Sequence, residues 1–160
     1  MPLLGHFLFL FDQLIYLCNV NIPNQTENFK FPKAEKLCNR KRIDSLFESG
    51  SSFYIHPVKV YYAVSASNEE DRAPVQLLIS IPKRNIKKAV DRNRLKRLIR
   101  ESYRLQKQQL AALCTIQNLI IDTAFVYTSR KPLKFREIHE IIFLILQRLN
   151  AICQQQSEIG

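Results

Sequence analysis

The sequence lacks the cysteine and histidine spacing of a metal site. Its four cysteines, Cys18, Cys38, Cys114 and Cys153, are far apart and form no CxxC pair, and none of the three histidines lies close to one of them. A zinc site needs several such ligands at short, regular spacing. We therefore expect reduced thiols and no metal-binding site in the protein.

The chain is also short of acidic residues. Asp and Glu number 14 against 24 Lys and Arg, which gives a formal net charge of +10 and a pI near 9.7. The first of the basic residues is Lys30. An apolar fraction of 46% over 160 residues is sufficient for one domain with a hydrophobic core. The charge favours a polyanionic partner, which on composition alone is either nucleic acid or an anionic membrane surface.

The N-terminal segment, residues 1–29, lacks the features of a signal peptide. Its apolar stretch MPLLGHFLFLFDQLIYLCNV has no basic start and no small-x-small cleavage site, and Asp12 and Gln13 interrupt it. Three alternatives stay open: a targeting or anchoring segment, an extra amphipathic helix, or an extension without function. We expect an N-terminal extension outside the domain over 1–29, the domain itself over 30–153 and a C-terminal tail over 154–160.

Hydrophobic periodicity predicts helices and strands along the domain. Apolar residues at spacings of three and four predict helices, and runs of β-branched and aromatic residues predict strands. The predicted elements are a helix at 36–49, a strand at 52–66 with a bend before Pro57, a strand at 75–82, a helix at 90–110, a strand at 118–129 and a helix at 135–153. The acidic turn SNEEDRAP predicts that the first two strands form a hairpin. This order predicts an α+β fold, a two-layer sandwich with the helices packed on one face of the sheet.

The stretch AVDRNRLKRLIRESYR, residues 89–104, combines six basic residues with leucine and isoleucine at helical spacing. On a helix the apolar stripe consists of Leu95, Leu98, Ile99, Leu105 and Leu110, and the opposite arc of Asn93, Lys96, Arg97, Arg100, Arg104 and Lys107. A solvated face is the ordinary explanation for such an arc. Here, however, the preceding KRNIKK adds four cations at the N-terminal end, where helix amides also attract anions. We therefore expect this face to bind the phosphates of a nucleic acid.

Aromatic residues accompany the first predicted helix and strand. Phe47, Phe53, Tyr61 and Tyr62 provide rings of the kind on which proteins stack unpaired bases, and packing in the core is the alternative explanation for each. The sequence shows no helix-turn-helix pair, zinc finger or heptad zipper beside the basic helix. Aromatic rings beside a strand are typical of proteins that bind single-stranded nucleic acid.

The segment SIPKRNIKKAVDRNRLKRLIRESYR resembles the Arg-Asn-Arg signature of the bacterial ribonuclease P protein subunit. The resemblance extends to LCNRKRIDSLFESGSSF, VKVYYAV and FVYTSRKP. It implies a mixed sheet with a left-handed β-α-β crossover through the basic helix, like that of the second domain of a small-subunit ribosomal protein and against the usual handedness. It also implies that the protein binds the catalytic RNA of ribonuclease P and the 5′ leader of precursor tRNA, while the RNA performs the Mg²⁺-dependent hydrolysis.

The resemblance assigns residues to two binding sites. Those expected to bind the catalytic RNA are Lys83, Arg84, Lys88, Arg92, Asn93, Arg94, Lys96, Arg97, Arg100 and Arg104. Those expected to bind the leader are Phe47, Phe53, Lys59 and Tyr61. Ile43 departs from the family at a position where many members have an aromatic residue. The expected partners are ribonuclease P RNA and precursor tRNA, the expected compartment is the cytoplasm, and no membrane partner is expected.

The sequence shows no catalytic constellation, because it has no motif of paired acids and no Ser-His or Cys-His arrangement. We therefore expect no catalytic residue and no dedicated cofactor site in the protein, with Mg²⁺ used by the RNA subunit. Asp91 and Asp122 are explained as a helix-start charge and a strand-end residue. Two alternatives are a general structured-RNA-binding or ribosome-associated protein without a role in tRNA cleavage, and a membrane-surface protein that depends on its N-terminal segment.

Overall fold

The computed structural model of the protein describes residues 31–66 and 73–157. The predicted extension at 1–29 and most of the acidic turn predicted at 67–74 lie outside these residues. The elements are a 3-10 helix η1 (Lys33–Glu35), α2 (Arg40–Ser49), β1 (Ser51–Ile55), β2 (Val58–Ala66), β3 (Val75–Ser80), α3 (Ala89–Gln106), α4 (Gln108–Ile116), β4 (Leu119–Tyr127) and α5 (Phe135–Ser157). The last helix thus continues past residue 153, where the sequence predicted the end of the domain.

The strands form one mixed sheet in the order β1-β2-β4-β3. β1 and β2 are antiparallel and are joined at His56 and Pro57 by a cis peptide bond. β4 pairs antiparallel with β2 and parallel with β3. The predicted hairpin between β2 and β3 is therefore wrong. The composition of the segment between β2 and β3 is typical of a turn, but the two strands are not neighbours in the sheet. β4, which is buried along most of its length, lies between them.

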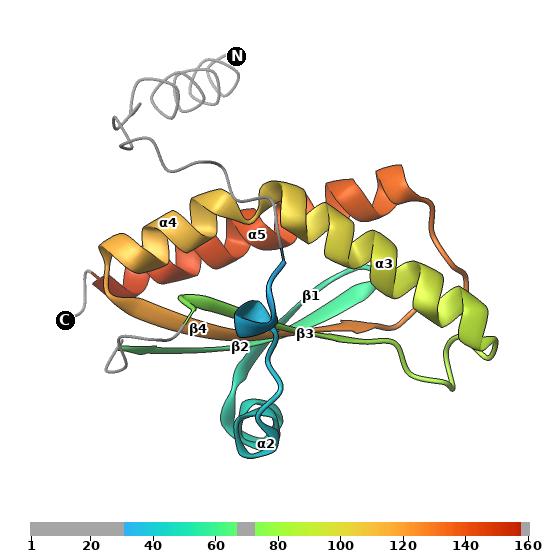
Figure 1. The fold of residues 1–160 in the computed structure, drawn as a ribbon, viewed down its shortest axis with the longest axis horizontal. Helices are drawn as coiled ribbons and strands as arrows, with labels where there is room; N and C mark the ends of the chain where they lie inside the picture. The colour runs from blue at the N-terminus through green and yellow to red at the C-terminus, as the bar shows by residue number, and fades with distance from the viewer. Residues whose placement is uncertain (1–30, 67–72, 158–160) are drawn as a thin grey trace, which may run out of the picture.

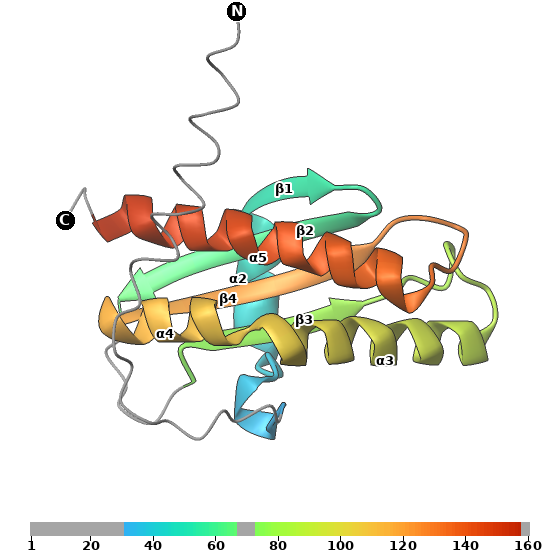
Figure 2. The same ribbon diagram turned by 90° about the horizontal axis from the view of Figure 1, so that it is seen from above.

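The chain crosses from β3 to its parallel neighbour β4 through α3 and α4. In Figure 2 the sheet is seen through these helices, both strands run from left to right, and β4 lies above β3 in the picture. When the view is turned so that both strands point upward, β4 therefore lies to the left of β3. A crossover with this geometry is left-handed, whereas parallel strands are joined by right-handed crossovers in nearly all proteins. The mixed sheet and the handedness implied by the family resemblance are therefore both present.

Helices cover both faces of the sheet (Figure 1). α3, α4 and α5 pack on one face, and α2 packs on the opposite face. The main core lies under the three helices and includes Val60, Phe125 and Ile142, while a smaller cluster around Leu46 and Ala124 lies under α2. The prediction of helices on one face is correct for three of the helices and wrong for α2. An apolar stripe predicts that one side of a helix is buried, but it does not predict which face of a sheet the helix covers.

The helix predicted at 90–110 is two helices that meet at Lys107. The sequence placed Lys107 on the polar arc, but its side chain is buried, at 5% exposure, and forms an ion pair with Glu35 of η1. Leu110 is buried as predicted, but Leu105 is 39% exposed and Tyr103 takes its place in the apolar stripe. Burying an ammonium without a counter-charge is unfavourable, so the buried Lys107 requires Glu35 beside it. The ion pair thereby holds η1 against the junction of α3 and α4.

Candidate nucleic-acid interface

The cationic face of α3 is held in place by the opposite side of the helix. Leu95 and Ile99 are buried in the main core. Residues on the other side are open to solvent: Asn93, Arg94 and Arg97 are exposed, and Lys96 and Arg100 are half-buried. The predicted division of this helix into an apolar and a cationic side is confirmed over its first three turns. We call the cationic side the α3 face.

The loop before α3, residues 82–88, lies against the start of the helix. The guanidinium of Arg92 donates from Nη1 to the main-chain oxygens of Ile86 and Lys87, at 3.0 and 2.7 Å. Asn85 donates from Nδ2 to the oxygen of Tyr127, at 2.8 Å, which fixes the loop to the end of β4. These bonds hold the exposed side chains of the loop beside the α3 face; they are Lys83, Arg84, Lys87 and Lys88. Arg92 thus has a structural use that the sequence did not indicate.

Arg104 differs from the other predicted RNA-binding residues because it already has an acidic partner. Its Nη2 lies 2.6 Å from Oε1 of Glu101, and its Nε donates to the second carboxylate oxygen at 2.9 Å. The hydrogen bonds from Arg104 lower the pKa of Glu101, and those same bonds raise the pKa of Arg104. Among the described residues that the sequence assigned to RNA binding, the exposed cations lie toward the N-terminal part of α3 and in the preceding loop.

A second surface lies on the α2 side of the sheet. The rings of Phe47 from α2 and Tyr61 from β2 meet edge to face, with centroids 4.8 Å apart. The ammonium of Lys59 lies 4.8 Å from the centroid of the Tyr61 ring. Phe47 is 41% exposed, so the rings are open to solvent on one side. We call these three residues the aromatic platform.

Phe53 does not belong to the aromatic platform, although the sequence grouped it there. It pairs with Val60 across the β1–β2 hairpin, and both side chains point into the main core under α5. Phe53 is 8% exposed, and the guanidinium of Arg148 from α5 lies 4.7 Å from its ring centroid. Successive side chains of a strand point to opposite faces, so Phe53 and Tyr61 cannot share a surface in this register. The sequence-based grouping of Phe53 is wrong.

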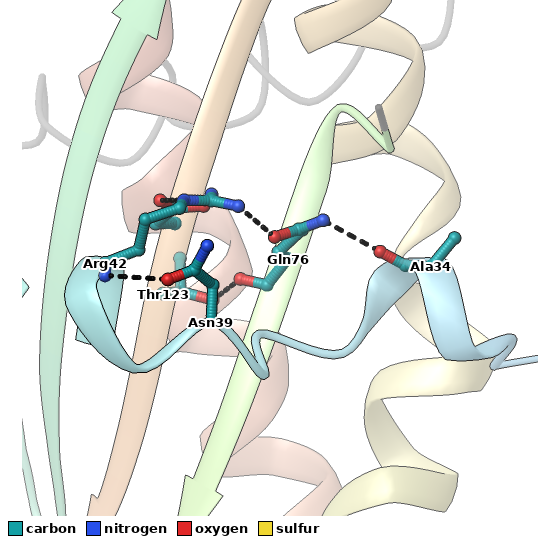
Figure 3. Close-up of polar contacts among 6 residues, drawn as sticks. Ala34, Asn39, Arg42, Gln76 and Thr123 are labelled. Carbon is teal, nitrogen blue, oxygen red and sulfur yellow. Dashed lines mark hydrogen bonds and ion pairs between the residues drawn. The ribbon is translucent and has the colours of Figure 1, made fainter. Parts of the chain in front are cut away.

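An ion-pair network fastens α2 to the sheet (Figure 3). Arg42 of α2 forms a two-pronged ion pair with Asp122 of β4, with Nε 3.0 Å from Oδ2, and its Nη1 donates to Oε1 of Gln76 at 2.7 Å. Gln76 in turn donates from Nε2 to the oxygen of Ala34 at 2.9 Å. Asn39 caps α2 by accepting from the amide of Arg42. The network links three segments that are far apart in the sequence.

This network was missed by the sequence analysis. Asp122 was explained as a strand-end residue, but it lies within β4, opposite Ala63 of β2 and Gln76 of β3. The available signal was a single acid inside an otherwise apolar strand, since a half-buried carboxylate requires a partner. Gly50 follows the last residue of α2, as predicted. A side chain at this position would collide with the main-chain oxygen of Leu46, so the helix end requires glycine.

A third group of cations also escaped the sequence analysis. Arg130, Lys131 and Lys134 are exposed in the loop between β4 and α5. The loop begins next to Tyr127, whose oxygen holds Asn85 of the loop before α3. On its other side, Thr128 lies 3.1 Å from the hydroxyl of Tyr54, on the strand beside Lys59. This loop therefore connects the two surfaces at one end of the sheet, and the signal for it was the basic run SRKPLK.

Neither a metal-binding cluster nor a membrane-spanning helix occurs in residues 31–66 and 73–157. No cluster of three or more His, Cys, Asp or Glu side chains that could hold a metal ion occurs among them. Within the same residues, no helix is both long and apolar enough to cross a membrane. The groups that the two surfaces present are cations and aromatic rings, which are suited to phosphates and bases.

Comparisons with known proteins extend these observations. A family profile described as Ribonuclease P matches residues 31–150. The ribonuclease P protein component of Porphyromonas gingivalis is 32% identical over 121 residues, 76% of this chain and 87% of that protein. The same component from Chlorobium phaeobacteroides is 46% identical over 83 residues, 51% of this chain and 57% of that protein.

Solved structures agree on the fold. The RNase P protein of Staphylococcus aureus superposes with a TM-score of 0.54 at 22% identity, over 72% of this chain and 94% of that one. The RNase P protein of Thermotoga maritima gives a TM-score of 0.53 at 21% identity, over 71% and 96%. The fold is α+β, and the family profile and the curated relatives place the chain among the proteins of a ribonucleoprotein. The chain belongs to the ribonuclease P protein family and is the protein component of a ribonuclease P holoenzyme, which confirms the subunit role predicted from the signature.

Replacing Arg42 with Gln should loosen α2 specifically. The change removes the charge that balances the half-buried carboxylate of Asp122, and we expect a loss of about 2 kcal/mol in the free energy of unfolding. Amide hydrogen exchange should become faster in α2 than in α5. Arg40→Gln is the matched control, since Arg40 is an exposed cation of the same helix. If α2 exchanges at the same rate in both variants, the network does not hold the helix.

Proposed function

We propose that the protein binds two RNA molecules on opposite faces of one sheet. The α3 face, with the loop at 82–88, binds the catalytic RNA of ribonuclease P. The aromatic platform binds the 5′ leader of precursor tRNA. The observation that carries this proposal is the separation of the cationic helix and the exposed rings by the sheet itself (Figure 1), which allows both partners to bind together.

The chemistry of the α3 face supports a phosphate backbone as its ligand. Guanidinium groups match phosphate oxygens in pairs and lose little hydration on binding. No side chain in the described part of the chain caps the amides at the start of α3, and Asp91 is the acid in its first turn. These amides add a partial positive charge to that of the nearby cations. A folded RNA presents many phosphates, so a rigid row of cations suits it.

The aromatic platform supports a single strand as its ligand. Bases of a leader are unpaired, and they stack on exposed rings without regard to sequence. Lys59 places a cation beside the Tyr61 ring, within reach of a phosphate next to a stacked base. Ile43 and Tyr61 both pack against the cluster beneath α2, but Ile43 has no ring, so Phe47 and Tyr61 provide the stacking groups here. Mature tRNA has no leader and leaves this surface without its ligand.

We further propose that the RNA subunit carries the hydrolysis and holds its Mg²⁺, and that the protein acts in the cytoplasm on precursor tRNA. The groups that the two surfaces offer are cations and aromatic rings, which are suited to binding phosphates and bases. The contribution of the protein is then to neutralise phosphates of the catalytic RNA and to hold the leader. Both effects favour the cleavage complex when Mg²⁺ is scarce.

Reconstitution tests this division of labour. The purified protein alone should not cleave precursor tRNA, and adding the cognate ribonuclease P RNA should produce cleavage at a Mg²⁺ concentration too low for the RNA alone. The measurement is the rate of 5′ leader release on a gel, with the RNA alone as the control. Cleavage of precursor tRNA by RNA-free protein contradicts the proposal. It is also contradicted if adding the protein does not raise the rate of leader release by the RNA at low Mg²⁺.

Neutralising the α3 face should flatten the salt dependence of binding to the catalytic RNA. The double variant Arg94→Gln/Arg97→Gln removes two exposed cations, and the slope of log affinity against log salt should fall by about 1.5. The matched control is Lys33→Gln/Arg40→Gln, which removes two exposed cations outside both surfaces. Equal slopes for the two double variants would mean that net charge, and not the α3 face, determines binding.

Removing the rings of the platform should weaken precursor tRNA binding by the holoenzyme and leave mature tRNA binding unchanged. For Phe47→Ala and Tyr61→Ala we expect a loss of about 1 to 3 kcal/mol in the binding free energy of precursor tRNA. Tyr61→Phe keeps the ring and should bind as the parent does. Circular dichroism establishes that each variant is folded. If a folded variant binds precursor and mature tRNA with equally reduced affinity, the assignment of the leader to this surface is wrong.

A further inference from the structure

Two cysteines face each other in the main core. Cys114 of α4 and Cys153 of α5 are both 0% exposed, and their sulfur atoms lie 3.9 Å apart. They are 39 residues apart in the sequence, with β4 and the loop after it between them. α4 lies at the end of the helical layer away from the start of α3, so the pair is remote from the α3 face (Figure 2). The third described cysteine, Cys38, is exposed.

The contact between the sulfur atoms couples the ionisation of the two thiols. The hydrogen bond with Cys153, together with burial, raises the pKa of Cys114, and the same bond lowers the pKa of Cys153. Either sulfur can be the donor, so the first proton lost from the pair leaves a thiolate that the remaining thiol stabilises. A thiolate that already touches a second thiol is the arrangement from which a disulfide forms by exchange.

We propose that Cys114 and Cys153 form an intramolecular disulfide when the protein meets a small-molecule disulfide, and that the bond joins α4 to α5. The side chains are already in contact, so rotation about their own bonds and a small movement of α4 bring the sulfurs to bonding distance. This proposal is independent of which RNA each surface binds. It assigns a redox modification to two residues that have no part in the α3 face or the aromatic platform.

The reaction balances with glutathione disulfide as the oxidant. The Cys153 thiolate attacks one sulfur of glutathione disulfide, forms a mixed disulfide and expels one glutathione thiolate, which takes up a proton. Cys114 then loses its proton to solvent and attacks the Cys153 sulfur, which expels the second glutathione thiolate. The two protein thiols lose two electrons and two protons in total, and one glutathione disulfide becomes two molecules of glutathione.

Burial sets the rate of this reaction. Glutathione disulfide cannot reach either sulfur in the closed core, so exchange requires local opening of α4. α4 has nine residues, follows the junction at Lys107 and ends beside Asn118, which has a positive φ of 52°. Such a short helix between two breaks can open without unfolding the sheet. The disulfide should therefore form more slowly than the mixed disulfide at Cys38.

The test uses the full chain with Cys18→Ser and Cys38→Ser, so that Cys114 and Cys153 are the remaining thiols. After incubation with glutathione disulfide, intact mass should fall by two hydrogens and a digest should contain a peptide linked through these two residues. The thermal midpoint should rise by about 5 to 10 °C and return to its original value on reduction, because the bond restricts the unfolded chain. Affinity for ribonuclease P RNA should not change, since the bond is remote from the α3 face.

Control variants and competing outcomes complete the test. Cys114→Ala and Cys153→Ala, each made in the same background, should show neither the mass loss nor the rise in thermal midpoint. In the unsubstituted chain, mass mapping gives the rate at Cys38 as an internal reference without any change to the core. The proposal fails if both buried thiols can still be alkylated in denaturant after incubation with glutathione disulfide for many times the period that Cys38 needs to react completely. It also fails if glutathione stays attached to either residue, or if the linked form melts at a lower temperature.

Discussion

The pairing of β4 with both β2 and β3 is the constraint on which the rest of the molecule depends. Because β4 runs parallel to β3, the chain must leave one end of the sheet and return to the other, and α3 and α4 make that return. This path places the start of α3 beside the loops at 82–88 and 128–134. The same strand supplies Asp122, which holds α2 on the opposite face. A single central strand thus positions both surfaces.

The basic residues of the chain have several different tasks, and net charge does not distinguish them. Arg42 and Lys107 are tied to acids in the interior of the fold, and Arg92 stabilises a loop by binding its carbonyl oxygens. Arg104 shares its charge with Glu101 on the surface. Among the exposed cations of the described residues, one compact group lies at the start of α3 and in the loop before it. A high pI favours a polyanionic partner but does not locate its binding site. The site is located by separating the cations that have partners within the protein from those that are exposed.

Local patterns predicted most of the helices and strands and the cationic side of α3. Periodicity depends on residues three and four apart, so it identified Leu95 and Ile99 as core residues and the residues opposite them as exposed. The failures all depend on contacts between distant segments. The position of β4, the face covered by α2 and the pairing of Lys107 with Glu35 join residues that no short window of sequence contains. Phe53 was misplaced for the same reason, since its face follows from the register of β1 on β2.

The alternation of side chains along β2 has a consequence for how this protein can change over evolution. Val58 and Val60 fill the core under the helices, while Lys59 and Tyr61 belong to the other face. Substitutions can therefore alter one face of the sheet without disturbing the other, because neighbouring residues of β2 lie on opposite faces. A single inserted or deleted residue cannot, since it moves every side chain beyond it to the opposite face. This strand should tolerate a wide choice of residues in relatives of the protein and almost no change in length.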